Sequence, residues 1–372
     1  MINIKKVETK KDWKEFVNLP FYLIYKENKN WVPPLKKDIL FKLDDKQHPF
    51  WEHAKCEVFI AEKDSQVAGR IAAIIDNNYN KLWNEKMGAF GFFEVINNYE
   101  VASTLFDTAY NWLKNNGMNN MRGPLSPSQN GECGFLLDAY DSPPVLMMPY
   151  NPPYYIELAE RYGFKKAKDL LAFYKANDDK PSRQIEITVK RLLQNPNIST
   201  RCLNMKNIEE ESGLIKKLYN ECWIKNWGFS PMTDKEFDLM VKELKTIADP
   251  NLIWFAYYKG NPAGIAITLP DFNYIIKKLN GKIGITGMLK FLYYKKKVKG
   301  TRALVFGFKK EYRRLGLPAL LYYKTEQAGI KRGYKWCELS WNLEDNDLIN
   351  QFDTKVGGHI YKKYRLYEKK IK

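Results

Sequence analysis

The sequence contains few residues of the kinds that bind metal ions or cross-link a chain. Only three of its 372 residues are histidine (His48, His53 and His359) and five are cysteine, with no CxxC pair among them. This pattern offers no zinc or iron–sulfur ligand set, so we expect no metal site. The scattered, odd-numbered cysteines predict buried thiols in a reducing compartment.

Long apolar runs are also missing. No stretch reaches the length of a membrane span, and the N-terminal segment MINIKKVETKKDWK is charged from Lys5 onward without the apolar core of a signal peptide. These two absences predict a cytoplasmic protein.

Apolar and aromatic residues are abundant. They make up 45% and 15% of the chain respectively, which is too much buriable surface for a protein that stays unfolded. A chain of 372 residues is also long enough for two domains, each with its own core.

Positive charge is concentrated rather than spread. The formal net charge is +17, and residues 273–300 contribute eight lysines and no acid, while residues 361–372 contribute six basic residues and one glutamate. Such a local excess predicts one or two basic faces, rather than a protein coated by nucleic acid.

Two stretches of the chain resemble each other. The segments VFIAEKDSQVAGRIAAIID and LIWFAYYKGNPAGIAITLPD each read as a strand, a polar turn and a second strand, and Gly69 corresponds to Gly264 at an offset of 195. Asn151 and Asn346, also 195 apart, each open a helix pattern that ends at a glycine. These markers predict a duplicated unit, and the alternative is that such patterns recur by chance in any α/β protein.

The duplication predicts two tandem domains of the α/β (α+β) class. We expect each to contain a mixed central sheet, with antiparallel hairpins and one parallel crossover, flanked by helices. The predicted boundaries are 1–175 for the first domain, 176–198 for a linker and 199–372 for the second domain.

A basic loop with a glycine follows the strand ALVFGF in the second repeat. Arg313, Arg314 and Gly316 precede a helix whose first N–H groups have no intrahelical partner and whose dipole favours an anion. Glycine allows a phosphate to approach the backbone, and the arginines supply charge-assisted hydrogen bonds. The loop therefore predicts a phosphate site, with a solvated turn as the alternative.

These residues resemble a known motif. Arg313-x-x-Gly316-x-Pro318 is similar to the Q/R-x-x-G-x-G/A loop that binds the acyl-CoA pyrophosphate in GNAT acyltransferases, and NDLINQFDTKVGG resembles the ending of the same superfamily. The order of predicted elements in both halves is also similar to a GNAT unit. The whole chain thus resembles a tandem GNAT protein.

The resemblance implies a groove for acetyl-CoA or another acyl-CoA as co-substrate in the second half. Its residues would be Phe306, Gly307, Arg313, Arg314, Leu315, Gly316, Leu317, Pro318, Ala319 and Asn346. Pro318 departs from the motif and removes one N–H donor from the loop. The first half lacks the arginines and the glycine after GFFEV, which predicts a scaffold and substrate wall there.

GNAT enzymes often use a glutamate and a tyrosine to move protons, and the tyrosine usually lies in the last helix. The corresponding segment here, QFDTK, has none. We therefore take Glu338, in the strand WCELSW, and Tyr364, in the last strand, as candidate catalytic residues. The alternatives are a salt-bridged strand residue for Glu338 and a packed aromatic for Tyr364.

The resemblance implies an acyl-CoA-dependent N-acyltransferase whose acceptor is the amine of a small molecule or a peptide. Two alternatives remain: a Fem-like transferase that uses aminoacyl-tRNA, and a tandem GNAT protein that binds a ligand without catalysis.

The lysine-rich segment 273–300 interleaves its lysines with apolar residues. We expect an amphipathic element over the cleft with its lysines outward. It is either a solvated helical hairpin or a surface for an anionic partner, tRNA or a membrane, whose binding would weaken with salt.

Overall fold

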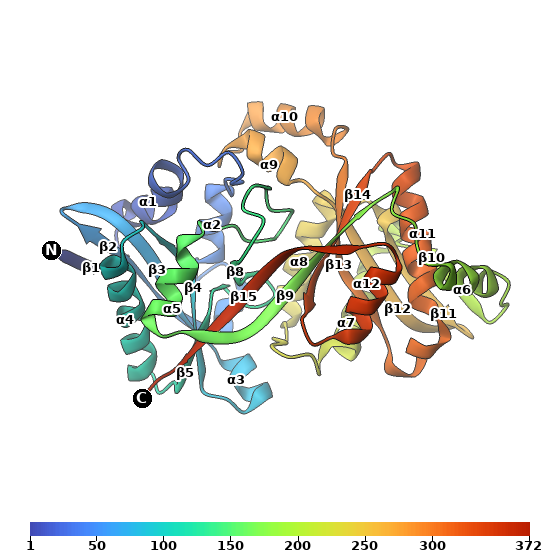
Figure 1. Cartoon of the computed structure of the whole chain (residues 1–372), viewed down its shortest axis with the longest axis horizontal. Helices are drawn as coiled ribbons and strands as arrows, with labels where there is room; N and C mark the ends of the chain where they lie inside the picture. Colours follow the sequence, from blue (N-terminus) through green and yellow to red (C-terminus); the bar gives the residue numbers. More distant parts are fainter.

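The computed structural model describes residues 1–372 and shows two halves with the same order of elements (Figure 1). The first half contains β1 (Ile2–Lys6), α1 (Lys10–Leu19), α2 (Lys36–Lys42), β2 (Ala54–Lys63), β3 (Gln66–Asp76), α3 (Asn77–Trp83), β4 (Met87–Val95), α4 (Tyr99–Asn115), β5 (Asn120–Gly123), α5 (Tyr154–Tyr162) and β9 (Lys165–Ala176). Between β5 and α5 lie three short strands, β6 (Leu125–Ser126), β7 (Glu132–Cys133) and β8 (Phe135–Leu136).

The second half repeats this order after the helix α6 (Arg183–Leu193), which lies within the predicted linker. It contains β10 (Ile198–Cys202), α7 (Ile208–Trp223), α8 (Asp234–Ile247), β11 (Ile253–Tyr258), β12 (Asn261–Pro270), α9 (Asn273–Leu279), α10 (Ile285–Lys295), β13 (Gly300–Phe308), α11 (Leu317–Lys331), β14 (Trp336–Leu343), α12 (Asp347–Lys355) and β15 (His359–Lys370). Only α10 lacks a counterpart in the first half, where α3 alone occupies the place of α9 and α10.

The two halves share one sheet of thirteen strands, whose main path runs β1-β2-β3-β4-β5-β15-β9-β14-β13-β12-β11-β10. Each half gives its last strand to the other, because β9 pairs with β14 and β15 pairs with β5. Figure 1 shows these two long strands side by side across the middle of the molecule. The two sequence repeats therefore build one continuous sheet. The predicted boundaries of the halves, residues 1–175 and 199–372, stay a proposal.

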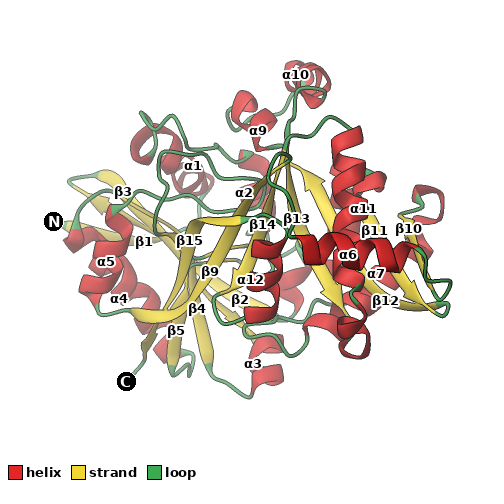
Figure 2. Cartoon of the chain, turned by 45° about the vertical axis from the view of Figure 1, so that its right-hand side comes forward, coloured by secondary structure: helices red, strands yellow, loops and turns green.

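The sheet is mixed. Its hairpins are antiparallel, and β4 with β5 and β13 with β14 form the parallel pairs that the crossover helices α4 and α11 require. Figure 2 shows helices around the strands, with α9 and α10 at one edge of the molecule. This arrangement confirms the predicted fold class of mixed sheets flanked by helices. No helix combines the length and the apolar character needed to cross a membrane.

The helix endings that the sequence predicted are present in both halves. Gly163 follows α5 with φ +98°, and Gly357 follows α12 with φ +99°, a backbone region that favours glycine. Asn346 precedes α12 as expected, but its side chain makes no capping hydrogen bond.

The larger clusters of buried apolar residues lie in the first half. Two core clusters of 27 and 22 buried residues are built mainly from that half, whereas the clusters centred on the second half contain 10, 6, 6 and 4 residues. The second half also contains a large cavity.

Candidate active site

The cavity begins where two parallel strands separate. β13 and β14 pair only from Gly300 to Ala303 and from Trp336 to Leu339, and the remaining residues of both strands line the cavity. Its volume is about 1620 Å³, and 28 of the 61 residues that line it are hydrophobic. Because the strands diverge, the backbone of Leu304–Phe308 has no pairing with β14 on the cavity side.

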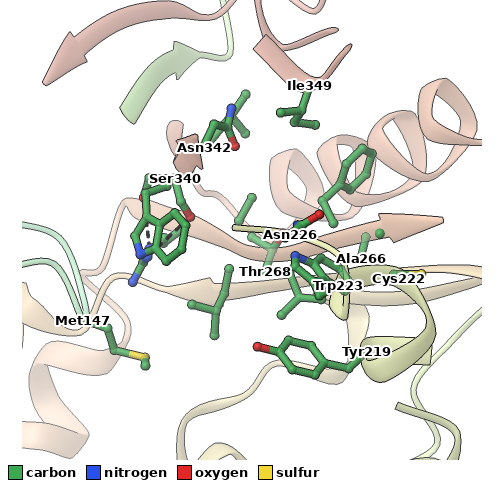
Figure 3. Close-up of a pocket in the computed structure, with 18 of the residues that line it drawn as sticks. Met147, Tyr219, Cys222, Trp223, Asn226, Ala266, Thr268, Ser340, Asn342 and Ile349 are labelled. Carbon is green, nitrogen blue, oxygen red and sulfur yellow. Dashed lines mark hydrogen bonds between the residues drawn. The ribbon is translucent and has the colours of Figure 1, made fainter. Parts of the chain in front are cut away.

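Both halves contribute walls to this cavity. Figure 3 shows Asn342 of β14 and Ile349 of α12 on one side, with Tyr219 and Trp223 of α7 on the other. The first half contributes residues 126–132 and Met147. The site therefore lies at the junction of the halves.

The predicted phosphate loop is a 3₁₀ turn, Lys310–Leu315, followed by Gly316 with φ +83° and by the first turn of α11. Arg313 and Arg314 are exposed and line the cavity, and Arg313 Nε donates to the carbonyl oxygen of Phe308 at 3.0 Å. A Cβ atom on Gly316 would lie 2.7 Å from Thr188 Cγ2 of α6, so this helix covers one side of the loop. The positive charge and the helix N-terminus are thus brought together, as a pyrophosphate site would require, whereas Gly316 faces α6 and not the cavity.

The structure divides the predicted co-substrate residues into two groups. Those that line the cavity are Phe306, Gly307, Arg313, Arg314, Pro318 and Asn346. The residues that do not line it are Leu315, Gly316, Leu317 and Ala319. Two of them, Leu317 and Ala319, lie in the first turn of α11 and are buried in apolar clusters.

Aromatic side chains close over the diverging strand β13. The Phe306 ring stacks on Phe352 of α12 with centroids 5.5 Å apart. A Cβ atom on Gly307 would lie 2.0 Å from the Trp223 indole, so a side chain at this position would displace that ring. Phe352 and Trp223 both line the cavity, which gives it an apolar floor.

Asp353 of α12 is a carboxylate in the cavity wall that sequence reasoning missed. Its side chain accepts a hydrogen bond from Asn342 Nδ2 at 2.7 Å, and the residue is only 4% exposed. Burial raises the pKa of Asp353 to about 7, although the Asn342 hydrogen bond opposes this shift. A carboxyl group with this pKa can both take and give a proton near neutral pH.

The equivalent position in the first half is Ala159. Each residue accepts a hydrogen bond from the N–H five residues later, Phe164 at 3.2 Å for Ala159 and Gly358 at 2.9 Å for Asp353, where the helix ends. The carboxylate is therefore particular to the half that contains the cavity. Its signal in the sequence is an aspartate four residues before the terminating glycine, in the segment QFDTK.

Glu338 and Tyr364, the candidate catalytic residues from the sequence, are both fully buried and do not line the cavity. Glu338 Oε1 accepts from Ser340 Oγ at 2.5 Å, and Oε2 accepts from the Tyr361 hydroxyl. Burial raises the pKa of Tyr364 well above its usual value, and its hydroxyl has no hydrogen-bond partner. Ser340 lines the cavity, so the Ser340 hydroxyl links Glu338 to the cavity.

A buried polar cluster joins this region to the first half. Arg302, 3% exposed, lines the cavity and donates to Ser340 Oγ at 3.0 Å and to the Leu146 carbonyl at 2.8 Å. Asp271 accepts from the Leu146 N–H at 2.9 Å, and burial raises its pKa to about 6. These bonds hold the segment that contains Met147 at the edge of the cavity.

The matching position in the first half is filled. β4 and β5 also pair over only three residues, Met87–Ala89 and Asn120–Arg122. A Cβ atom on Gly91 would lie 1.6 Å from the Leu125 carbonyl oxygen, and the Phe92 N–H donates to Ser126 Oγ at 3.0 Å. The chain itself thus occupies the space that is open in the second half.

No group of three or more histidine, cysteine, aspartate or glutamate side chains is arranged to hold a metal ion.

Comparisons with known proteins give full-length matches. No family model matches the sequence. The chain is 33% identical over 371 residues to the protein YghO of Escherichia coli (strain K12), covering 97% of this chain and 94% of that protein. It is also 33% identical over 379 residues to a bacterial ceramide synthase of Caulobacter vibrioides (strain NA1000 / CB15N), covering 100% and 98%.

Among solved structures, the fold is similar to that of a tandem GNAT protein from the clavulanic acid biosynthesis pathway. The TM-score is 0.59 at 10% identity, and the match covers 100% of this chain and 99% of that one. At this identity the match concerns the fold alone.

Proposed function

Because this chain belongs to the same family as YghO and the bacterial ceramide synthase and has a fold similar to that of a tandem GNAT protein, we propose that it transfers a long-chain acyl group from acyl-CoA to a long-chain lipid amine. The product would be an N-acylated lipid base of the ceramide type. The observation that carries this proposal is the large, half-apolar cavity between β13 and β14, with the basic loop at one edge and Asp353 in its wall.

The donor would enter along β13. Arg313 and Arg314 offer charge-assisted hydrogen bonds to the pyrophosphate, beside the N-terminus of α11. The unpaired edge Leu304–Phe308 offers backbone donors and acceptors to the amides of the pantetheine arm. The thioester would then lie between β13 and β14, near α12.

The size of the cavity supports lipid substrates. Its volume of about 1620 Å³ exceeds the roughly 300–1,000 Å³ of ordinary small-molecule pockets. The pantetheine arm of the donor would occupy part of this space, and the rest would hold the acyl and amine chains. Two aliphatic chains would bury their surface against its apolar side chains, such as Leu304, Trp341 and Met147.

In the transfer itself, the amine nitrogen attacks the thioester carbonyl carbon. A C–N bond forms, the C–S bond breaks, the amine loses a proton and the CoA thiolate gains one. Asp353, whose pKa is about 7, takes the proton from the amine and returns one to the thiolate sulfur. Asn342 holds the carboxyl group in place at 2.7 Å.

The proposal is tested by incubating the purified chain with palmitoyl-CoA and sphinganine. We expect N-palmitoyl product by mass spectrometry and free CoA thiol in equal amounts. N,N-dimethylsphinganine serves as the control, because its tertiary amine has no proton to lose and yields no stable amide. Thiol release without amide would instead indicate a thioesterase, and turnover that requires aminoacyl-tRNA would indicate the Fem-like alternative.

A further inference from the structure

The outer face of α10 carries four exposed apolar side chains. Ile285, Met288, Leu289 and Leu292 are 86%, 60%, 63% and 61% exposed, and their spacing places them on one stripe of the helix. Monomeric proteins rarely leave a contiguous apolar stripe uncovered without a binding role. We define these four residues as the outer face.

The opposite face of α10 already anchors the helix to the protein. Gly287 is buried, and Phe291 and Tyr294 pack against a small core built from Phe272 and α9. The Phe272 and Phe291 rings lie 5.3 Å apart. The packing of this opposite face is enough to hold α10 on the protein, so the fold does not require the outer face to be apolar.

Positive charge is concentrated in the same segment as the outer face. Residues 273–300 contain eight lysines and no acid. All but one of these lysines are exposed: Lys278, Lys282, Lys290, Lys295, Lys296, Lys297 and Lys299. The sequence predicted lysines outward over the cleft. The structure places apolar residues outward beside them, and α10 does not line the cavity.

We propose that the outer face of α10 and its flanking lysines dock this protein onto an anionic lipid bilayer. An apolar stripe flanked by lysines is the composition of a helix that lies in the membrane interface, with its apolar side in the acyl region and its charges at the headgroups. RNA offers phosphates to the lysines but no apolar partner for Met288, Leu289 and Leu292. An anionic bilayer satisfies both features.

The position of α10 suits this role. The helix lies at the outer edge of the molecule in both views (Figures 1 and 2). The segment α9–α10 is also joined to a loop of the first half that borders the cavity, because Asn273 Nδ2 donates to the Pro144 carbonyl at 2.9 Å and Met147, three residues further along and 38% exposed, lines the cavity. A docked protein would therefore hold this loop near the bilayer, and the delivery of a lipid amine past it rests on the proposed function.

The docking surface itself is testable without any acyl transfer. The purified full chain, with no acyl-CoA present, is floated with vesicles of equal phosphatidylglycerol and phosphatidylcholine, and with phosphatidylcholine alone. We expect binding to the anionic vesicles that weakens with salt, and much weaker binding to the neutral ones.

Two variants separate the apolar and the electrostatic contributions. Met288→Gln with Leu289→Gln and Leu292→Gln should lower partition into anionic vesicles at least about tenfold at every salt concentration. Lys295→Gln with Lys296→Gln and Lys297→Gln should lower it about 100-fold at low salt and flatten the salt dependence. Ile187→Gln with Leu193→Gln, 56% and 50% exposed on α6, is the matched control and should bind as the wild type.

Hydrogen exchange on the unmodified protein provides a second readout. Anionic vesicles should protect the backbone amides of residues 283–296 of the wild-type protein from exchange. This result does not depend on whether the variants fold. Vesicle binding that survives loss of the outer face, or tRNA binding without vesicle binding, would overturn the inference. Vesicle binding in a protein without transferase activity would leave it standing and contradict only the proposed function.

Discussion

The two halves of this protein have nearly the same elements in the same order, but only in the second half do the parallel strands open into a large cavity. In each half, a pair of parallel strands separates after a few residues. Residues Leu125 and Ser126 fill the opening in the first half, whereas the opening in the second half stays empty and adjoins a basic loop. The comparison teaches that the repeated fold produces the opening between the parallel strands in both halves. The residues next to these strands then determine whether the opening is filled or becomes a cavity.

The contrast extends to how each half is packed. The filled half forms the larger apolar clusters, and burial of apolar surface stabilises a fold by about 25 cal/mol per Å². The open half leaves apolar side chains around its cavity and borrows β9 from the first half to complete its sheet beside β14. The exchange is reciprocal, because β15 pairs with β5 of the first half, and the scaffold role of the first half stays a prediction.

The largest expected effect comes from the carboxylate that distinguishes the halves. Asp353→Asn should lower kcat by about 10²–10⁴-fold, because the proton of the amine loses its acceptor. The wild-type rate should rise with pH around a midpoint near 7, and the variant should lose that dependence. Steady-state kinetics across pH measures both effects.

Glu94→Gln is the matched control for Asp353→Asn. Glu94 is a partly buried carboxylate of the first half, and burial raises its pKa to about 7 as well, but it does not line the cavity. We expect its kcat to remain within about twofold of the wild type. Equal losses in the two variants would mean that Asp353 acts through the fold rather than on the substrate.

Asp353→Asn should also change stability in a direction set by the same pKa. The folded pKa of about 7 lies above the unfolded value of 3.8, so the residue contributes stability below pH 3.8 that is lost as pH rises through 7. At pH 8 the variant should be more stable than the wild type by roughly 1–4 kcal/mol, and at pH 4 the two should be alike. Thermal melts at both pH values test this, and a less stable variant at pH 8 would contradict it.

Glycine substitutions compare the filled and the open positions directly. Gly91→Ala places a Cβ atom 1.6 Å from a backbone oxygen that cannot rotate away, so unfolding free energy should fall by about 3 kcal/mol or more. Gly307→Ala meets the Trp223 side chain, which borders open space and can shift. Its stability should fall by only about 1 kcal/mol. Denaturant titrations that rank the two in the opposite order would break the comparison.

The next prediction concerns a contact between the halves. His53 Nδ1 lies 3.1 Å from Asp76, and Nε2 lies 3.0 Å from Glu236 of the second half. Burial lowers the pKa of His53, but the two carboxylates outweigh it and raise the value from 6.5 to about 9.

Since the folded pKa of His53 is raised, its stabilisation is complete below pH 6.5 and is lost as pH rises through 9. His53→Gln should cost about 2 kcal/mol at pH 6.5 and little above pH 9.5. Denaturant titrations at the two pH values measure this difference. A cost that is the same at both would show that the imidazolium charge contributes nothing.

Most of the fold could be predicted from the sequence, because it depends on local patterns that repeat. The hairpin of β11 and β12, the helix ending at Gly357 and the loop before α11 all carry turn and cap residues that act over a few positions. The exchange of β9 and β15 could not be predicted, since each strand has the same pattern whichever neighbour it pairs with.

The candidate site was predictable only in part, for a similar reason. Arg313 and Gly316 follow one strand and precede one helix, so their proximity is local. Whether Glu338 or Asp353 faces the cavity depends on how separate segments of the chain pack together. Ser340 and Tyr361 enclose Glu338, whereas Asn342 orients Asp353. The catalytic roles of Glu338 and Tyr364 stay predictions, and we expect Glu338→Gln to lower kcat less than Asp353→Asn does.

The central claim is that the open half alone binds the acyl donor, and calorimetric titration with a non-hydrolysable acyl-CoA thioether tests it most directly. We expect one site per chain, weakened at least about tenfold by Arg313→Ala with Arg314→Ala, because two charge-assisted contacts to phosphate are lost. The same titration should be unchanged by Lys10→Ala with Lys11→Ala, an exposed pair at the start of α1 in the filled half. Two sites per chain, or wild-type affinity in the double arginine variant, would contradict the account.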